Sequence, residues 1–162
     1  MEKPVIETGT LSFLPPDKFR REVKGKSLTI CDGTTLWMYY PAFQEVEKYS
    51  LGSNRMLRES LTAMTAGLGL QDVEKDYSIK AEHLGSGYRV QLTPKTSALH
   101  RLVSRITLDL NPGLTADRMQ IETSKDESST LIFSNERRVK FSPSDFAFQP
   151  PPGVSVTEPL AK

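Results

Sequence analysis

Apolar and polar residues alternate along most of this chain, in short runs separated by Gly, Pro, Asn and Asp. In the run 87–92, Tyr88, Val90 and Leu92 alternate with Arg89 and Gln91, which places the apolar side chains on one face of a strand. The same period of two recurs at Ile106, Leu108 and Leu110, at Met119 and Ile121, and at Leu131 and Phe133. The pattern predicts roughly nine or ten strands joined as an antiparallel meander.

Turn-forming sequences separate these runs. They are Asp32-Gly33, Gly85-Ser86-Gly87 and Asn111-Pro112-Gly113. Glycine supplies a positive φ and proline a fixed φ, as tight hairpins require. We therefore expect a hairpin at each of these positions.

The segment 53–68 follows a period of 3.6 instead of two. Its apolar stripe is Leu57, Leu61, Met64 and Leu68. This spacing is typical of a helix, which Ser53 or Asn54 can begin and Gly67 or Gly69 can end. We expect the helix, near residues 54–67, to lie on the concave face of a single curved sheet. An ordinary core helix and a movable lid both fit this stripe.

Composition narrows the class of protein. The 162 residues fit one domain, 1–162. The formal net charge of +1 gives no field that would attract nucleic acid. No window approaches the ~20 consecutive apolar residues that span a bilayer, so we do not expect an integral membrane protein.

Catalytic and metal-binding patterns are missing from the sequence. The lone Cys31 comes directly before a predicted turn and reads as a strand residue, and His83 and His100 are two potential metal ligands without a third. The basic run 137–140 reads as a solvated turn. The sequence therefore predicts neither an enzyme nor a cofactor or metal site.

Two segments combine aromatic residues with proline. They are residues 34–41, Thr-Thr-Leu-Trp-Met-Tyr-Tyr-Pro, and residues 146–156, which begin Phe-Ala-Phe-Gln-Pro-Pro-Pro-Gly. Core packing alone explains each segment taken singly. Both faces of the first segment are apolar, so alternation does not decide which face points inward.

Taken together, these segments resemble the LolA family of periplasmic outer-membrane lipoprotein carriers. Residues 30–41 look like the family's SDGKTLWxYxP hairpin, and residues 146–154 are similar to its FxFxPPxGV ending. Residues 9–20 resemble its GxLxxxRPxxFRW hairpin, and residues 90–95 its LTPK strand end. The four motifs occur in family order over about residues 8–156.

The chain also departs from the family pattern. Pro15-Pro16 replaces the family's Arg-Pro pair, whose arginine joins barrel and lid, and Arg21 replaces an aromatic residue. The chain begins at the position of the family's second strand, so we expect it to lack the family's N-terminal helix and first strand. The first ten residues contain no apolar signal segment and no Cys for lipid attachment.

The resemblance implies a mainly β fold, a curved and incomplete antiparallel half-barrel with a helical lid over its concave face. It implies a non-enzymatic periplasmic carrier that holds the acyl chains of lipoproteins in an apolar hollow. It also implies two partners, an inner-membrane lipoprotein-releasing transporter and an outer-membrane lipoprotein receptor. A sensing module that uses the same hollow to signal to a protein partner remains an alternative.

Alternation and resemblance together select the side chains expected to line the hollow and bind an acyl chain. These are Phe19, Trp37, Tyr39, Leu57, Leu61, Met64, Val90, Ile106, Leu108, Met119, Ile121, Phe133, Phe146 and Phe148.

Overall fold

The computed structural model describes residues 3–15, 17–55, 57–58, 61 and 73–159. These residues contain eleven strands. The chain divides into two compact units, unit 1 with residues 1–58 and 140–162, and unit 2 with residues 59–139. Each unit holds one sheet.

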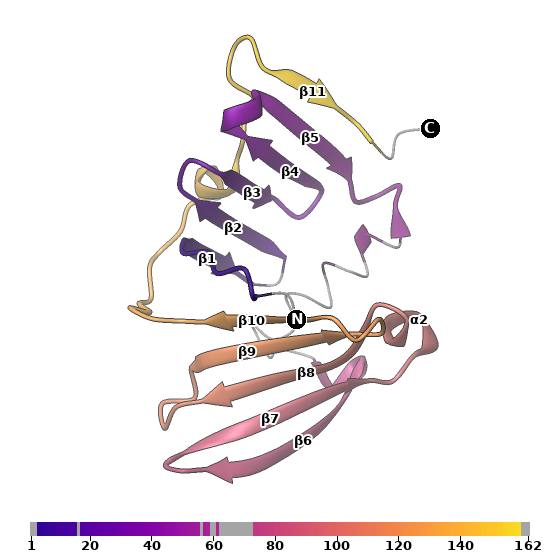
Figure 1. Ribbon diagram of the computed structural model, residues 1–162, viewed down its shortest axis with the longest axis vertical. Coiled ribbons are helices and arrows are strands. Elements are labelled where there is room, and N and C mark those ends of the chain that lie inside the picture. The colour runs from indigo at the N-terminus through magenta and orange to yellow at the C-terminus, as the bar shows by residue number, and fades with distance from the viewer. Residues whose placement is uncertain (1–2, 16, 56, 59–60, 62–72, 160–162) are drawn as a thin grey trace. The chain divides into compact units, whose positions relative to one another are not determined.

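The sheet of unit 1 has six strands in the order β1-β2-β3-β4-β5-β11 (Figure 1). The strands are β1 (Thr10–Leu14), β2 (Lys18–Val23), β3 (Ser27–Cys31), β4 (Thr35–Tyr40), β5 (Glu45–Ser50) and β11 (Ser155–Thr157). Neighbours from β1 to β5 pair antiparallel, as expected for hairpins. The short β11 returns from the far end of the chain and pairs parallel with β5.

The turn between β3 and β4 shows why the Asp32-Gly33 sequence forms a hairpin. One oxygen of Asp32, Oδ1, accepts hydrogen bonds from the backbone N–H groups of Thr34 and Thr35, at 2.9 and 2.8 Å. Gly33 takes a φ of +98°, a conformation that glycine adopts without steric cost. The aspartate thus replaces a missing backbone partner, as is common in tight turns.

The predicted helix begins where the sequence placed its cap. Asn54 Oδ1 accepts a hydrogen bond from the backbone N–H of Leu57 at 2.8 Å, and Arg55, Leu57, Arg58 and Leu61 are helical. This is the geometry of an N-cap. The rest of the segment up to Gly67, with Met64, and the position of the helix as a lid lie outside the described residues.

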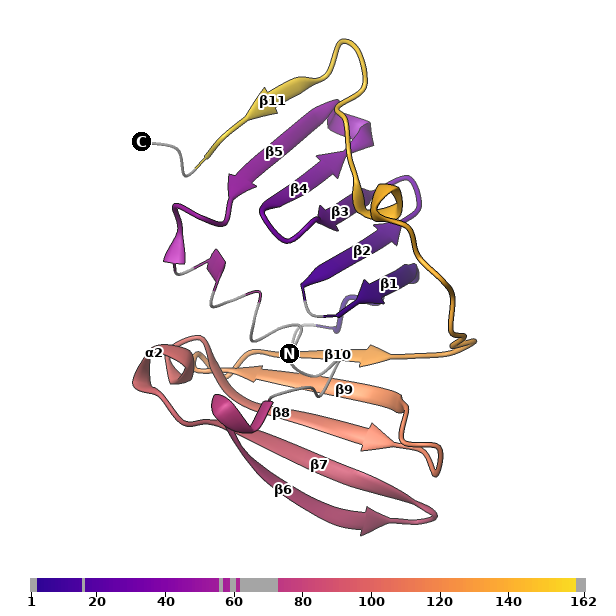
Figure 2. The ribbon, with the colours of Figure 1, turned by 180° about the vertical axis from the view of Figure 1, so that it is seen from behind.

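The sheet of unit 2 is an antiparallel meander of five strands in the order β10-β9-β8-β7-β6, and both views show them side by side (Figures 1 and 2). The strands are β6 (Tyr77–Leu84), β7 (Gly87–Pro94), β8 (Val103–Leu110), β9 (Ala116–Thr123) and β10 (Ser128–Ile132). Two short elements flank it, the 3-10 turn η2 (Val73–Lys75) and the helix α2 (Ser97–His100). The alternating runs thus form strands where the pattern predicted them.

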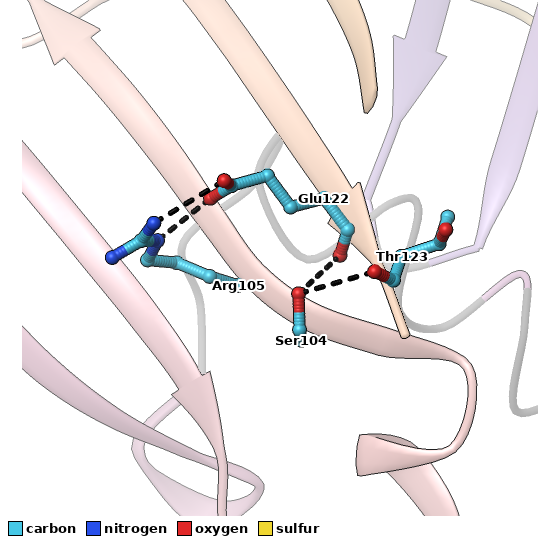
Figure 3. A network of polar contacts seen from close by, with 4 residues as sticks. All are labelled: Ser104, Arg105, Glu122 and Thr123. Carbon is cyan, nitrogen blue, oxygen red and sulfur yellow. Dashed lines mark hydrogen bonds and ion pairs between the residues drawn. The ribbon is translucent and has the colours of Figure 1, made fainter. Parts of the chain in front are cut away.

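A bulge interrupts the pairing of β8 with β9. Val103 pairs with Thr123 and Arg105 with Glu122. Ser104 is therefore an extra residue on β8 that has no pairing partner on β9. The Ser104 hydroxyl donates to the backbone carbonyl oxygens of Glu122 and Thr123, at 3.0 and 3.4 Å (Figure 3). Because of the extra residue, Val103 and Ile106 both have buried side chains although they are three positions apart.

The prediction of a single sheet is wrong, because the described strands form two sheets, and the prediction of purely antiparallel pairing fails at β11. A strand of three residues whose side chains are all exposed carries no alternation signal. The mainly β class of the fold is confirmed.

One glycine of unit 2 provides a test of this packing. A Cβ on Gly87 would clash with the backbone carbonyl oxygen of Leu110 on the neighbouring strand β8. We expect Gly87→Ala to lower the free energy of unfolding by about 1–3 kcal/mol, because a backbone atom cannot move aside cheaply. Gly52→Ala is the matched control, because nothing lies within 4 Å of that position. Equal denaturation midpoints for the two variants would contradict the close approach.

Candidate functional site

Five of the predicted lining residues meet on one face of the unit 2 sheet. Cross-strand pairing joins Val90 to Leu108 and Leu108 to Met119, and it joins Ile106 to Ile121. Residues directly opposite in an antiparallel pair point to the same side. All five belong to one buried cluster, against which Phe133 packs as a partly buried member. These six side chains therefore gather within unit 2, and their contact with an acyl chain stays a prediction.

The centre of this apolar face is buried, while its edge on β6 is exposed at Ile79. Leu92, Ile106 and Leu108 are 0% exposed, and Val90 is 9% exposed. The cluster also contains residues that the sequence analysis did not select, namely Val73, Tyr77, Leu92, Leu99 and Val103. The alternation of Tyr88, Val90 and Leu92 could have identified Leu92, whereas the bulge at Ser104 hides Val103 from any pattern of period two.

The opposite face of the same sheet carries charged side chains that form ion pairs with one another. Arg89 Nε lies 2.8 Å from Asp109 Oδ1, and Arg89 Nη2 lies 3.2 Å from Asp109 Oδ2. Hydrogen bonds from Arg89 hold the pKa of the Asp109 carboxyl below its ordinary value. Arg105 makes a second two-pronged pair, with Glu122, and lowers the pKa of that carboxyl in the same way (Figure 3). Charged groups are thus segregated from the apolar face.

In unit 1 the predicted residues do not share a face. Phe19 pairs with Cys31, and Cys31 pairs with Leu36, so these three side chains lie on the same side of the sheet. Trp37 and Tyr39 alternate with Leu36 along β4 and therefore lie on the other side. The prediction that Phe19, Trp37 and Tyr39 line one hollow together is therefore wrong. Alternation fixes facing within one strand, but only the register between strands relates β2 to β4.

Trp37 and Tyr39 belong instead to an aromatic cluster that the C-terminal segment completes. The ring of Phe148 lies 5.5 Å from that of Trp37 and 5.9 Å from that of Tyr39, measured between centroids. Lys48 Nζ, on the adjacent strand β5, lies 5.3 Å from the centroid of Trp37. Tilted ring pairs and a cation over a ring are both stabilising. This cluster attaches the segment that leads to β11.

Phe146 packs as a core residue of unit 1. It ends the 3-10 turn η3 (Pro143–Phe146), is 0% exposed, and meets the ring of Phe141 at 5.2 Å. Leu57 and Leu61 are half-buried helical residues. Met64 is outside the described residues. The use of Leu57, Leu61 and Met64 against a ligand stays a prediction.

The cysteine and histidines considered in the sequence analysis lie on three different elements of the described structure. Cys31 lies in strand β3, as predicted, and its burial raises the pKa of its thiol. His83 stacks on Tyr88 at one end of β7, while His100 closes α2 near the other end at Pro94. In the described part of the chain no three His, Cys, Asp or Glu side chains could hold a metal ion. The basic run 137–140 is exposed.

An open depression of about 580 Å³ lies at the end of unit 2 that carries α2. Its lining is Pro94, Lys95, Thr96, Ser97, His100, Arg101 and Ser124. Hydroxyl and basic groups dominate this lining, so it does not match the needs of an acyl chain. The apolar face of unit 2 remains the better candidate site.

The aromatic cluster of unit 1 generates a spectroscopic test, because Trp37 is the sole tryptophan of the chain. We expect Phe148→Ala to shift the Trp37 emission to longer wavelength and to lower the free energy of unfolding by about 1–3 kcal/mol. Phe43→Ala is the control, because the Phe43 side chain is 75% exposed. An unchanged emission spectrum for Phe148→Ala would show that the two rings do not meet in solution.

Comparison with known proteins identifies the family of the chain. A sequence model of the family described as outer membrane lipoprotein carrier protein LolA matches residues 1–149. An outer-membrane lipoprotein carrier protein of Chromobacterium violaceum is 29% identical over 153 residues, which are 92% of this chain and 71% of that protein. A protein of the same description from Pseudomonas aeruginosa is 24% identical over 152 residues, 93% of this chain and 71% of its own. No helix in the described residues is long and apolar enough to cross a membrane. The chain belongs to the LolA family of outer-membrane lipoprotein carrier proteins.

Proposed function

We propose that this protein is a non-enzymatic carrier that binds the acyl chains of lipoproteins and takes them through the periplasm to the outer membrane. It would receive its cargo from an inner-membrane lipoprotein-releasing transporter and deliver it to an outer-membrane lipoprotein receptor. The names of its relatives favour carriage over the alternative of a sensing module. The proposal treats the two units as parts of one carrier domain.

The observation that carries the proposal is the apolar face of the unit 2 sheet. Its cluster consists of aliphatic, aromatic and sulfur-containing side chains from every central strand, and none of the buried residues described is charged. An acyl chain needs such a surface and no charged partner. Withdrawing one CH₂ group from water is favourable by about 0.8 kcal/mol, which comes to about 12 kcal/mol for a chain of about 16 carbons.

Binding in this proposal requires opening. Because Leu92, Ile106 and Leu108 are fully buried, an acyl chain can reach them only by replacing the groups that now cover them. One apolar contact is exchanged for another, so the net cost of opening stays small compared with the gross burial energy. The helix that carries Leu57 and Leu61 is our candidate for the element that moves. Exchange of this kind lets a carrier both hold and release its cargo.

Neighbouring residues on β10 provide a matched test. Leu131 pairs with Met119 on the apolar face and is half-buried, whereas Ile132 pairs with Arg118 on the charged face and is 79% exposed. We expect Leu131→Glu to weaken binding of a fluorescent fatty-acyl probe about tenfold or more, because the carboxylate must be desolvated. Ile132→Glu should leave the affinity within about twofold. The measurement is a fluorescence titration of the purified protein.

Two results would contradict the proposal. One is a wild-type protein that does not bind the acyl probe at all. The other is equal affinity for Leu131→Glu and Ile132→Glu when circular dichroism shows both to be folded. Transfer of an acylated peptide from donor to acceptor vesicles would then separate a carrier from a protein that only binds the lipid.

A further inference from the structure

One polar atom in unit 2 is buried without a partner. Tyr77 begins β6 and is 1% exposed, and its phenolic oxygen makes no hydrogen bond within the described structure. Tyr77 pairs with Pro94 and so points to the same side of the sheet as Leu92. It is a member of the apolar cluster, together with Val73 and Leu99.

Such a group is costly in a protein that only needs a stable core. An unsatisfied buried hydroxyl keeps the penalty of leaving water and gains nothing in return. Phenylalanine would fill the same space without this penalty. Burial raises the pKa of Tyr77 to about 12, so the group is a protonated donor at neutral pH.

The surface around the hydroxyl limits what could satisfy it. The cluster to which Tyr77 belongs also contains Val73, Leu92, Leu99 and Val103, all of them apolar. A partner must therefore arrive together with a long apolar group that fits beside them, and it must offer an oxygen as acceptor. The carbonyl group that joins an acyl chain to its carrier molecule has both properties.

Given the proposed function, we propose that Tyr77 is a ligand-binding residue that donates a hydrogen bond from its hydroxyl to the ester or amide carbonyl of the bound acyl group. The apolar face then binds the acyl chain, and Tyr77 recognises the carbonyl group through which the chain is attached. The hydroxyl would set a preference for acyl groups over plain alkyl chains of equal length.

Three probes of equal chain length test this preference: a fluorescent long-chain acyl ester, the matching acyl amide, and the matching alkyl ether, which lacks the carbonyl. We expect the wild-type protein to bind at least one carbonyl probe roughly three- to tenfold more tightly than the ether. Tyr77→Phe should remove this preference while it leaves the affinity for the ether within about twofold. Whichever carbonyl probe binds more tightly identifies the linkage that is recognised.

Tyr88→Phe is the matched control. Tyr88 faces the same side of the sheet from the opposite end of β7, but it is half-buried and stacks on His83. This variant should keep the preference for the carbonyl probe.

Thermal unfolding of the empty protein gives a readout that does not depend on any probe. Because the hydroxyl has no partner to lose, Tyr77→Phe should unfold at the same temperature as the wild type or at a higher one. A melting temperature several degrees lower would reveal a partner within the protein and would overturn the inference.

The inference and the proposed function fail in different ways. Failure of all three probes to bind would refute the carrier proposal. Equal binding of ester, amide and ether by the wild type, or a preference that survives in Tyr77→Phe, would leave acyl binding intact and would refute the role of Tyr77.

Discussion

The segregation of side chains across the unit 2 sheet is the constraint on which the rest of the candidate site depends. Successive residues of a strand point to opposite faces, so each apolar position of β7, β8 and β9 is followed by a polar one. Register then aligns the apolar positions, as with Val90, Leu108 and Met119. The same register brings Arg89 and Asp109 together on the other face. A shift of one residue would bury these charges and expose the core.

In unit 1, large side chains are not confined to one face of the sheet. Its central strand β4 carries large side chains on both faces, so each face needs a cover. On one face, Trp37 and Tyr39 are met by Phe148 from the C-terminal segment. The parallel pairing of β11 with β5 continues this attachment along the sheet edge. The aromatic and proline-rich end of the chain thus completes the fold of unit 1.

Within unit 2, an apolar face with a buried centre gives the proposed carrier its chemistry. A permanently open apolar surface of this size would favour aggregation. Because its buried side chains carry no charge, this face would bind an acyl chain in the proposed function without breaking an ion pair. The hydroxyl of Tyr77 is a buried polar group within this apolar cluster. In our proposal it distinguishes acyl groups from plain alkyl chains.

The sequence alone identified half of the buried core of unit 2, namely Val90, Ile106, Leu108, Met119 and Ile121, because alternation is a local property of each strand. Its hairpin and cap signals were also local, and the Asp32-Gly33 turn and the Asn54 cap form as expected. Only the tertiary structure decided the relations between distant segments. Register placed Phe19 and Trp37 on opposite faces, and the bulge at Ser104 brought Val103 into the core. The consecutive strands β5 and β6 belong to different sheets, and β11 from the far end of the chain pairs in parallel with β5. These features depend on which strands meet and in what alignment, and a periodic pattern within one strand carries no information about its neighbour.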